Sequence, residues 1–271
     1  MYLTLLTTIK LIKLINITRL EMPRNLRVHI APIGFEFRRV TEPLVRMQAD
    51  KVYLLTLSPQ DRAKEFYVQI KGELSLNYKH IRIEEVFIDI WDFYACVEEF
   101  REIILKEQIE GNHVYVNVST GTKITAIAGM LSCMMWGGYP YYARTSYVTT
   151  REIEVPPTEL VEEADILPVY DIKKPRPDIL YVLSLLKENG GRLKKLRLIE
   201  KLESIGTIRL KDETKREFTE SAKHSQLRAI LDPMEIEWNY IKVEARGRRS
   251  EVFITEQGET ALRIFGTQQK R

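Results

Sequence analysis

Polar residues that could bind an anion follow an apolar run in the middle of the sequence. Residues 119–123, Ser-Thr-Gly-Thr-Lys, separate the run 113–118 from a stretch rich in small and apolar residues. Hydroxyls, a flexible glycine, helix N–H groups and an ammonium group together favour an anion, usually phosphate. The alternative is an ordinary Ser/Thr N-cap with a tight turn. That alternative does not explain a lysine in the first helical turn, where the helix dipole disfavours a cation.

A second polar segment, residues 32–36 (Pro-Ile-Gly-Phe-Glu), follows the first apolar run of the patterned chain. Neither G-x-G-x-x-G nor G-x-x-x-x-G-K-[ST] occurs, which argues against a dinucleotide cofactor and a P-loop. Cys96 and Cys133 are far apart and lack C-x-x-C spacing, so we expect neither a disulfide framework nor a metal site. The site is therefore expected to recognise phosphates without a cofactor.

Residues 25–150 read as alternating strands and helices. Apolar runs without polar alternation, separated by helical segments, are typical of a parallel sheet covered on both faces. The fold class predicted is a Rossmann-like, doubly wound α/β domain, in which ligands bind at the carboxyl ends of strands near the switch point. The expected strands are 26–32, 51–57, 81–90, 113–118 and 139–143, and the expected helices are 37–48, 61–74, 93–104 and 122–136.

The segment 117–123, Asn-Val-Ser-Thr-Gly-Thr-Lys, resembles the signature loop of CARF domains, the CRISPR-associated Rossmann folds. The family pattern is Asn/Asp-x-Thr-Gly-Gly-Thr-Lys, so Ser119 and Thr120 depart from it. Residues 29–40 and 50–55 are similar to the opening of archaeal CARF–winged-helix regulators.

This resemblance implies a homodimer that binds a cyclic oligoadenylate across its two-fold axis, with cyclic tetra-adenylate as the first expectation. Two of the residues implied to contact this ligand have an alternative interpretation: Trp91 could pack in the core, and Asp92 could be the N-cap of a helix. The ligand-binding residues that the resemblance implies are Gly34, Phe35, Glu36, Trp91, Asp92, Ser119, Thr120, Gly121, Thr122 and Lys123.

Some CARF domains cleave their own ligand without metal, which leaves slow ring-nuclease activity as an alternative. Lys123 would then stabilise the developing charge while Ser119 or Thr120 orients the phosphate. No histidine is placed as a general base, so we expect binding without catalytic residues.

The C-terminal part differs in charge and pattern. Residues 1–171 carry 19 Lys+Arg and 23 Asp+Glu, whereas residues 172–271 carry 22 and 15. The basic part suggests a polyanionic partner, against the alternative of a randomly basic surface.

Five prolines mark residues 151–177 as a linker. The domains expected are an extension (1–24), a CARF-like domain (25–150), the linker (151–177, in which 165–171 could still pair as a strand) and a second domain (178–271).

Residues 178–271 resemble a winged helix-turn-helix, which implies binding to duplex DNA. A helix begins with Asp178 as its cap and ends at 189–191, a second includes 193–202, and the third, 218–231, is the expected reader of the major groove. Strands 240–244 and 251–255 flank an Arg-rich wing, and a last helix opens at Thr255. The alternative is a winged helix used only for dimer contacts. The expected DNA-binding residues are Ser221, Lys223, His224, Ser225, Gln226, Arg228, Arg246, Arg248 and Arg249.

Two other segments of the sequence have alternative interpretations. Asp178 with Glu213 and Lys215 loosely matches a metal-nuclease motif, but that chemistry needs its acids on adjacent strands, so we interpret the match as coincidence. The N-terminal segment is apolar but interrupted by Lys10, Lys13 and Arg19, so no membrane span is expected, against the alternative of a membrane-surface helix. Met22 is an alternative start of the protein chain.

For the whole chain, the sequence predicts a cytoplasmic, ligand-responsive DNA-binding regulator.

Overall fold

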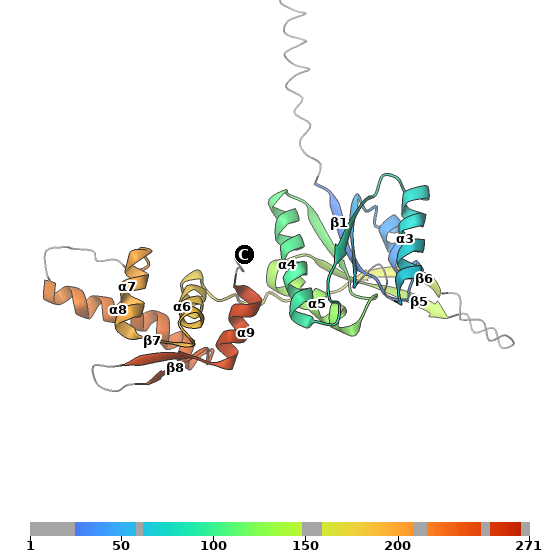
Figure 1. The fold of residues 1–271 in the computed structure, drawn as a ribbon. Coiled ribbons are helices and arrows are strands. Elements are labelled where there is room, and N and C mark those ends of the chain that lie inside the picture. The colour runs from blue at the N-terminus through green and yellow to red at the C-terminus, as the bar shows by residue number, and fades with distance from the viewer. Residues whose placement is uncertain (1–24, 58–61, 148–158, 209–215, 245–249, 267–271) are drawn as a thin grey trace, which may run out of the picture. The chain divides into compact units, whose positions relative to one another are not determined.

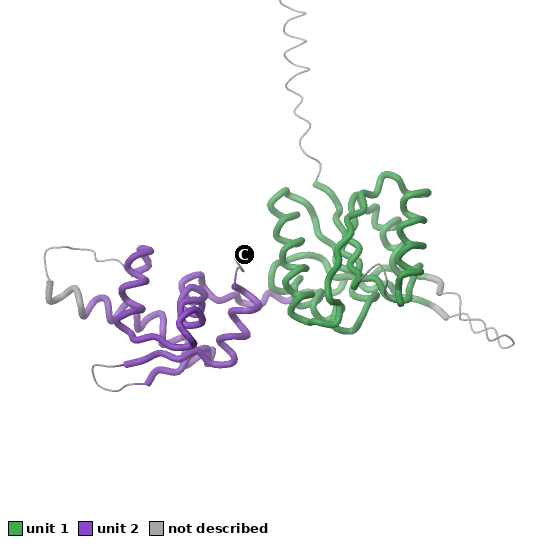
Figure 2. Tube along the Cα trace, in the orientation of Figure 1, with its two compact units in different colours: residues 1–169 green, residues 170–271 purple. Residues whose placement is uncertain are grey.

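The computed structural model describes residues 25–57, 62–147, 159–208, 216–244 and 250–266. The chain divides into two compact units, residues 1–169 and 170–271, which are described separately (Figure 2). This boundary differs from the predicted linker 151–177, because part of that segment belongs to the sheet of the first unit.

The first unit is built on a six-stranded sheet with the order β3-β2-β1-β4-β5-β6 (Figure 1). Neighbouring strands from β3 to β5 pair in parallel, and only β6 is antiparallel to its neighbour. All six residues of β2 are buried, as expected for a strand covered on both faces. The predicted fold class is therefore confirmed. The strands are β1 (Arg27–Pro32), β2 (Lys51–Thr56), β3 (Arg82–Phe87), β4 (His113–Asn117), β5 (Tyr139–Tyr147) and β6 (Glu159–Ile166).

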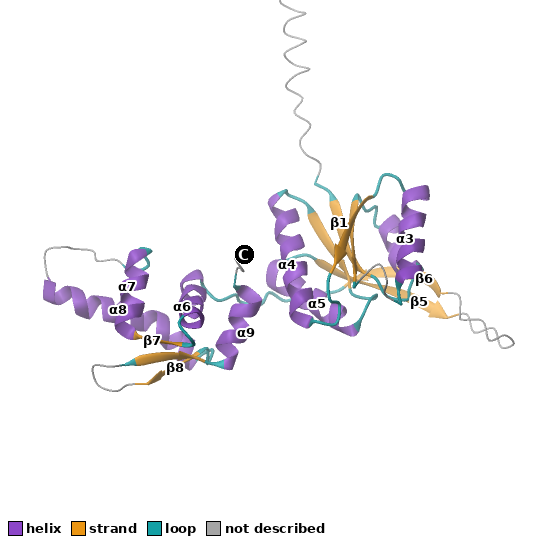
Figure 3. Cartoon of the chain, in the orientation of Figure 1, coloured by secondary structure: helices purple, strands orange, loops and turns teal. Residues whose placement is uncertain are grey.

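Helices cover both faces of this sheet (Figure 3). Right-handed crossovers place α2 and α3 on one face and α4 and α5 on the other. Gly129 lets α5 approach β4 closely, since a Cβ at this position would lie 2.9 Å from Val116 Cγ1. The helices are α2 (Arg38–Arg46), α3 (Lys64–Asn77), α4 (Phe93–Ile109) and α5 (Lys123–Trp136).

The strand in the predicted linker is β6, and it lies earlier in the sequence than the expected 165–171. It pairs with β5 from Tyr141↔Ile166 to Tyr147↔Glu159. The guanidinium of Arg46 donates to the main-chain oxygens of Val161 and Glu162 at 2.7 and 2.6 Å. Helix α2 therefore holds β6 against the sheet, a long-range contact that proline density does not reveal.

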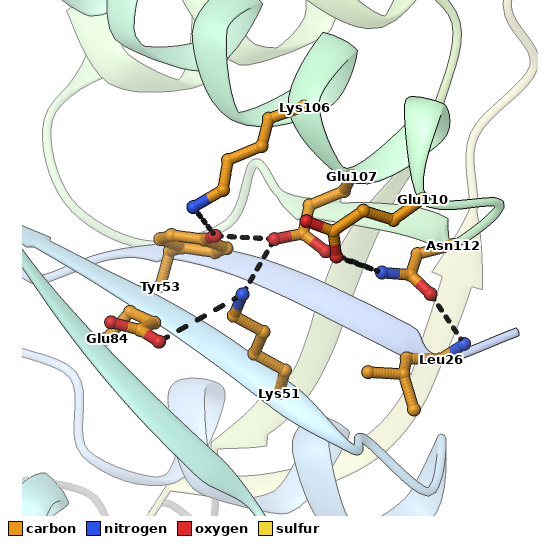
Figure 4. A network of polar contacts seen from close by, with 8 residues as sticks. All are labelled: Leu26, Lys51, Tyr53, Glu84, Lys106, Glu107, Glu110 and Asn112. Atoms are coloured by element: carbon orange, nitrogen blue, oxygen red, sulfur yellow. Dashed lines mark hydrogen bonds and ion pairs between the residues drawn. The ribbon is translucent and has the colours of Figure 1, made fainter. Parts of the chain in front are cut away.

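The amino edge of the sheet contains a buried polar network (Figure 4). Glu107 of α4 is fully buried and accepts hydrogen bonds from Lys51 at 2.7 Å, Tyr53 at 2.5 Å and Asn112 at 2.7 Å. Asn112 in turn accepts from the main-chain N–H of Leu26 at 3.0 Å. The network thus ties β2, α4 and the start of β1 together at the edge opposite the carboxyl ends of the strands. Its outer members are Glu84, Lys106 and Glu110.

The second unit places a three-stranded sheet, in the order β7-β9-β8, against four helices within the described residues. The three-residue strand β7 was not predicted; it pairs with β9, so the helix expected over 193–202 begins only at Lys195. Arg176, not Asp178, is the N-cap of the first helix, with Pro177 at its first position. The elements are α6 (Pro177–Glu188), β7 (Arg192–Lys194), α7 (Lys195–Ser204), α8 (Arg216–Ile236), β8 (Ile241–Glu244), β9 (Glu251–Ile254) and α9 (Glu256–Phe265).

Helix α8 is longer than predicted because it continues through Pro233. Proline normally ends a helix, but here Met234 is fully buried in the core of the second unit, and this packing extends the helix to Ile236. In the described part of the chain, no helix has the length and apolarity needed to cross a bilayer.

Candidate functional site

The loops after β1 and β4 touch at the carboxyl edge of the sheet. Strands β1 and β4 are neighbours although β2 and β3 separate them in sequence, so this is the switch point at which α/β sheets bind ligands. A Cβ on Gly34 would lie 2.9 Å from Gly121 N, and Gly121 itself has φ +78°. The structure therefore brings the two predicted polar segments together, and glycine allows both the contact and the turn.

The three hydroxyls of the predicted phosphate loop point into the protein. Ser119 Oγ donates to Asn117 Oδ1 at 2.5 Å and accepts from Ala143 N at 3.1 Å. Thr120 is 2% exposed and donates to Pro32 O at 2.8 Å. Thr122 caps α5, accepting from the main chain of that helix and donating to Ile90 O at 3.1 Å. These hydroxyls shape the loop, which is a different role from the phosphate contact expected of them.

Main-chain N–H groups and one lysine provide the donors that remain. The N–H groups of Thr120, Gly121, Lys123 and Ile124 make no hydrogen bond to any residue that the structure describes. The Lys123 side chain is exposed and has no ion pair with the described residues. Unpaired N–H groups at a turn and helix start, with a cation beside them, can bind an anionic oxygen.

Phe35 and Glu36 lie in the facing loop. Phe35 is 62% exposed and contacts Phe66 edge-on, with ring centroids 5.8 Å apart. The Glu36 carboxylate lies over Gly34, where a Cβ would be 2.5 Å from Oε2. An acidic group in this position suits a hydroxyl donor better than a phosphate.

Trp91 and Asp92 follow β3 and differ in role. Trp91 is 66% exposed, so the alternative of core packing is wrong for it. Asp92 is the N-cap of α4, since its Oδ1 accepts from Tyr94 N at 2.8 Å and Ala95 N at 3.3 Å. The bond from Thr122 to Ile90 O connects this loop to the start of α5.

Replacing Gly34 by alanine is expected to lower the free energy of unfolding by about 1–3 kcal/mol and to weaken anion binding, because the new Cβ would push the two loops apart. Chemical denaturation and ligand titration of the same variant test both effects. Gly72→Ala is the matched control, because a Cβ there meets nothing within 4 Å. Alanine favours a helix more than glycine does, so this change should raise the free energy of unfolding by up to about 1 kcal/mol. Unchanged stability and affinity in Gly34→Ala would contradict the close contact.

The structure separates the predicted DNA-binding residues of α8 into two groups. Ser221, His224, Ser225 and Arg228 are exposed and share one side of the helix by their i, i+3, i+4, i+7 spacing. Lys223 is ion-paired with Glu203, and Gln226 is only partly exposed. Arg246, Arg248 and Arg249 lie outside the described residues.

The loosely matched nuclease motif does not assemble on strands in the described chain. Asp178 lies in the first turn of α6, where both carboxylate oxygens accept from Arg176 at 3.1 and 2.9 Å. Glu213 and Lys215 lie outside the described residues.

Sequence reasoning did not select Asn117 as a site residue. It is fully buried at the end of β4 and bonds both Ser119 and the main chain of α2. Its place at the start of the Asn-Val-Ser-Thr-Gly-Thr-Lys segment is the signal that could have identified it.

Two domain families match the chain. Residues 27–148 match the model described as "HFX_2341_N:-like, N-terminal", and residues 178–266 match the "DUF6293 C-terminal winged helix domain". An uncharacterized protein of Methanocaldococcus jannaschii, MJ1513, is 26% identical over 231 residues, covering 73% of this chain and 68% of its own. An uncharacterized protein of Archaeoglobus fulgidus is 25% identical over 217 residues, covering 80% and 87%.

Similar solved structures include Enterococcus italicus Csm6 bound to cyclic hexa-2'-fluoro-hexa-dAMP, with a TM-score of 0.41, 14% identity and coverage of 79% of this chain. Another is Can2 from Sulfobacillus thermosulfidooxidans in complex with cyclic tetra-adenylate, with a TM-score of 0.37, 14% identity and coverage of 89%. This chain spans 56% and 63% of those two chains. The chain therefore combines a Rossmann-like α/β domain that is similar to the HFX_2341_N-like family with a second unit that is similar to the DUF6293 C-terminal winged helix domain.

Proposed function

We propose that this protein is a DNA-binding regulator whose CARF-like domain binds a cyclic oligoadenylate and whose winged helix binds duplex DNA. The observation that carries the proposal is the set of N–H groups beside Lys123, at the switch point of the first unit, that have no partner among the described residues. It occurs in one chain with a winged helix domain.

The surroundings of these donors fit a ligand that has bases and sugars as well as phosphates. Phe35 and Trp91 expose large aromatic side chains on the loops after β1 and β3, and such rings can stack on adenine. Glu36 can accept from a ribose hydroxyl. A homodimer that doubles this site about a two-fold axis would match a ring with repeated phosphates, and cyclic tetra-adenylate is the ligand to test first.

Binding is favoured over ring cleavage by the direction of the loop hydroxyls. Ser119 and Thr120 already donate their protons to Asn117 and Pro32, so neither is available to orient a phosphate by donation. Lys123 remains for electrostatic recognition, and binding requires no more than that.

The DNA-binding part of the proposal rests on α8 and on the basic wing in the sequence. We propose that Ser221, His224, Ser225 and Arg228 face the major groove. Arg228 Nε donates to Asp232 Oδ2 at 3.2 Å in the described structure. On binding DNA, Arg228 would therefore exchange this intramolecular partner for a base or a phosphate.

The function is tested by titrating labelled duplex DNA with the full chain, with and without cyclic tetra-adenylate. Reciprocal coupling is expected between the two ligands. If cyclic tetra-adenylate (the ring) changes the affinity of the protein for DNA by some factor, DNA changes the affinity for the ring by the same factor. Intact ring after prolonged incubation supports binding without cleavage. Absence of duplex binding at low salt would reject the regulator.

Replacing Arg246, Arg248 and Arg249 together by alanine is expected to flatten the salt dependence of DNA binding, because each lost phosphate contact lowers the log–log slope by about 0.9. Ring affinity without DNA should stay unchanged. Fluorescence anisotropy at several salt concentrations measures the slope, and an unchanged slope would remove the wing from the DNA interface. Arg197→Ala in α7, whose side chain is paired with Glu200, controls for loss of one positive charge.

A further inference from the structure

We propose that Asn117 is a positioning residue that holds the 119–123 loop in its anion-binding shape. This inference rests on the proposed function for its ligand, but its structural basis is independent of which anion binds. Asn117 is fully buried at the last position of β4, two residues before Ser119, where the loop begins. It does not itself reach solvent, so it can affect a ligand only through the residues it contacts.

Three hydrogen bonds hold the Asn117 amide in place. An amide oxygen accepts two hydrogen bonds and an amide nitrogen donates two. Oδ1 accepts from Ser119 N at 2.9 Å and from Ser119 Oγ at 2.5 Å. Nδ2 donates to Arg39 O at 2.9 Å. One side chain therefore fixes the first residue of the loop relative to α2.

These contacts are part of a closed set around the loop. Ser119 Oγ accepts from Ala143 N, and the Ala143 carbonyl accepts from Arg39 Nε at 3.2 Å. The path from Asn117 through Ser119 and Ala143 to Arg39 thus returns to Asn117. A loop held in this way presents its outer N–H groups in one arrangement, which reduces the ordering cost of ligand binding.

Removing the amide would take a hydrogen-bond partner from three partly buried groups. In Asn117→Ala the Ser119 N–H, the Ser119 hydroxyl and the Arg39 carbonyl each lose their partner, and the first two belong to the loop itself. The loop would then sample other conformations, and its N–H groups would no longer be held in one arrangement. The expected result is loss of ligand affinity and of local protection together.

The chain offers a matched control at the other edge of the sheet. Asn112 is also a buried asparagine, 8% exposed, and it links Leu26 N to Glu107. It precedes β4, whereas Asn117 ends it. Asn112→Ala should therefore destabilise the same domain without affecting the 119–123 loop.

The experiment compares the two variants in the full chain by amide hydrogen exchange and by titration with cyclic tetra-adenylate. Asn117→Ala should speed exchange of the hydrogen-bonded amides of Val118, Ser119 and Thr122 by about tenfold or more, and should weaken ring binding by about tenfold. Asn112→Ala should leave that exchange unchanged and ring affinity within about threefold. Ser119→Ala, which keeps the Ser119 N–H bond, should give an intermediate effect and serves if Asn117→Ala does not fold.

The outcomes separate this inference from the function on which it rests. Unchanged exchange over 118–124 in both Asn117→Ala and Ser119→Ala would overturn the positioning role, whatever the ligand. If exchange changes as expected but the wild-type chain binds no cyclic oligoadenylate, the positioning role stands and the proposed ligand is wrong. Equal acceleration in Asn112→Ala would show general destabilisation and would also overturn it.

Discussion

Replacing Lys123 by alanine is expected to weaken binding of cyclic tetra-adenylate by roughly 10–150-fold, which corresponds to the about 1.5–3 kcal/mol typical of a charged hydrogen bond. Lys123 is exposed at the start of α5 and makes no ion pair with the described residues, so its ammonium is available to the ligand. Its helix position is otherwise unfavourable for a cation, which means that stability should stay the same or rise slightly.

Isothermal titration calorimetry with the purified full chain measures this change. Lys79→Ala is the matched control, because Lys79 is also exposed but lies before β3, at the amino edge of the sheet. Lys123→Arg should recover part of the affinity, since the charge is kept while the geometry changes. Wild-type affinity in a folded Lys123→Ala variant would remove this lysine from the site.

Replacing Glu107 by alanine is expected to lower the free energy of unfolding by about 3 kcal/mol, at the lower end of the range for breaking a buried ion pair. The loss is large because Lys51, whose side chain is 8% exposed, would keep its charge without its main partner. Glu84 lies 4.0 Å from the same ammonium and limits the effect. Chemical denaturation at neutral pH measures it, with Glu110→Ala, an exposed neighbour in the same network, as the control.

The pH dependence of stability should change with the same substitution. Burial would raise the pKa of Glu107, but hydrogen bonds from Lys51, Tyr53 and Asn112 hold its pKa below the ordinary value. A lowered folded-state pKa stabilises the protein above the unfolded-state pKa, and this contribution is lost as pH falls through the folded-state value.

Lys51 acts at the other end of the pH range. Burial would lower its pKa, but bonding to Glu107 and Tyr53 raises that pKa above its ordinary value, so its contribution is lost only as pH rises through the raised value. The free energy of unfolding of the wild-type chain should therefore change little around neutral pH and should fall at strongly acidic and strongly alkaline pH. Glu107→Ala should flatten the acidic fall, and an equally steep fall in the variant would contradict the role of this network.

Local patterns in the sequence were sufficient for the architecture of both units. The apolar runs of β1, β2 and β4 and the helical stripes between them define a parallel sheet, because burial on both faces leaves no polar alternation. The predicted start of the last helix at Thr255 is confirmed by its bond to Gly258 N. The turn glycines Gly190 and Gly191 have positive φ, as the end of a helix requires.

Long-range contacts decided what those patterns could not. Strand β6 forms where Arg46 and β5 hold it, and α8 continues through Pro233 because Met234 packs into the core. Contacts in the folded chain turned the hydroxyls of the 119–123 loop inward, exposed Trp91 and bonded the Asn117 amide to both Ser119 and α2. The order of strands and loops along the chain was enough to predict that residues 32–36 and 119–123 meet at the switch point. Which of them face a ligand depended on partners from distant segments such as Ala143 and Arg39, and residue spacing does not encode those directions.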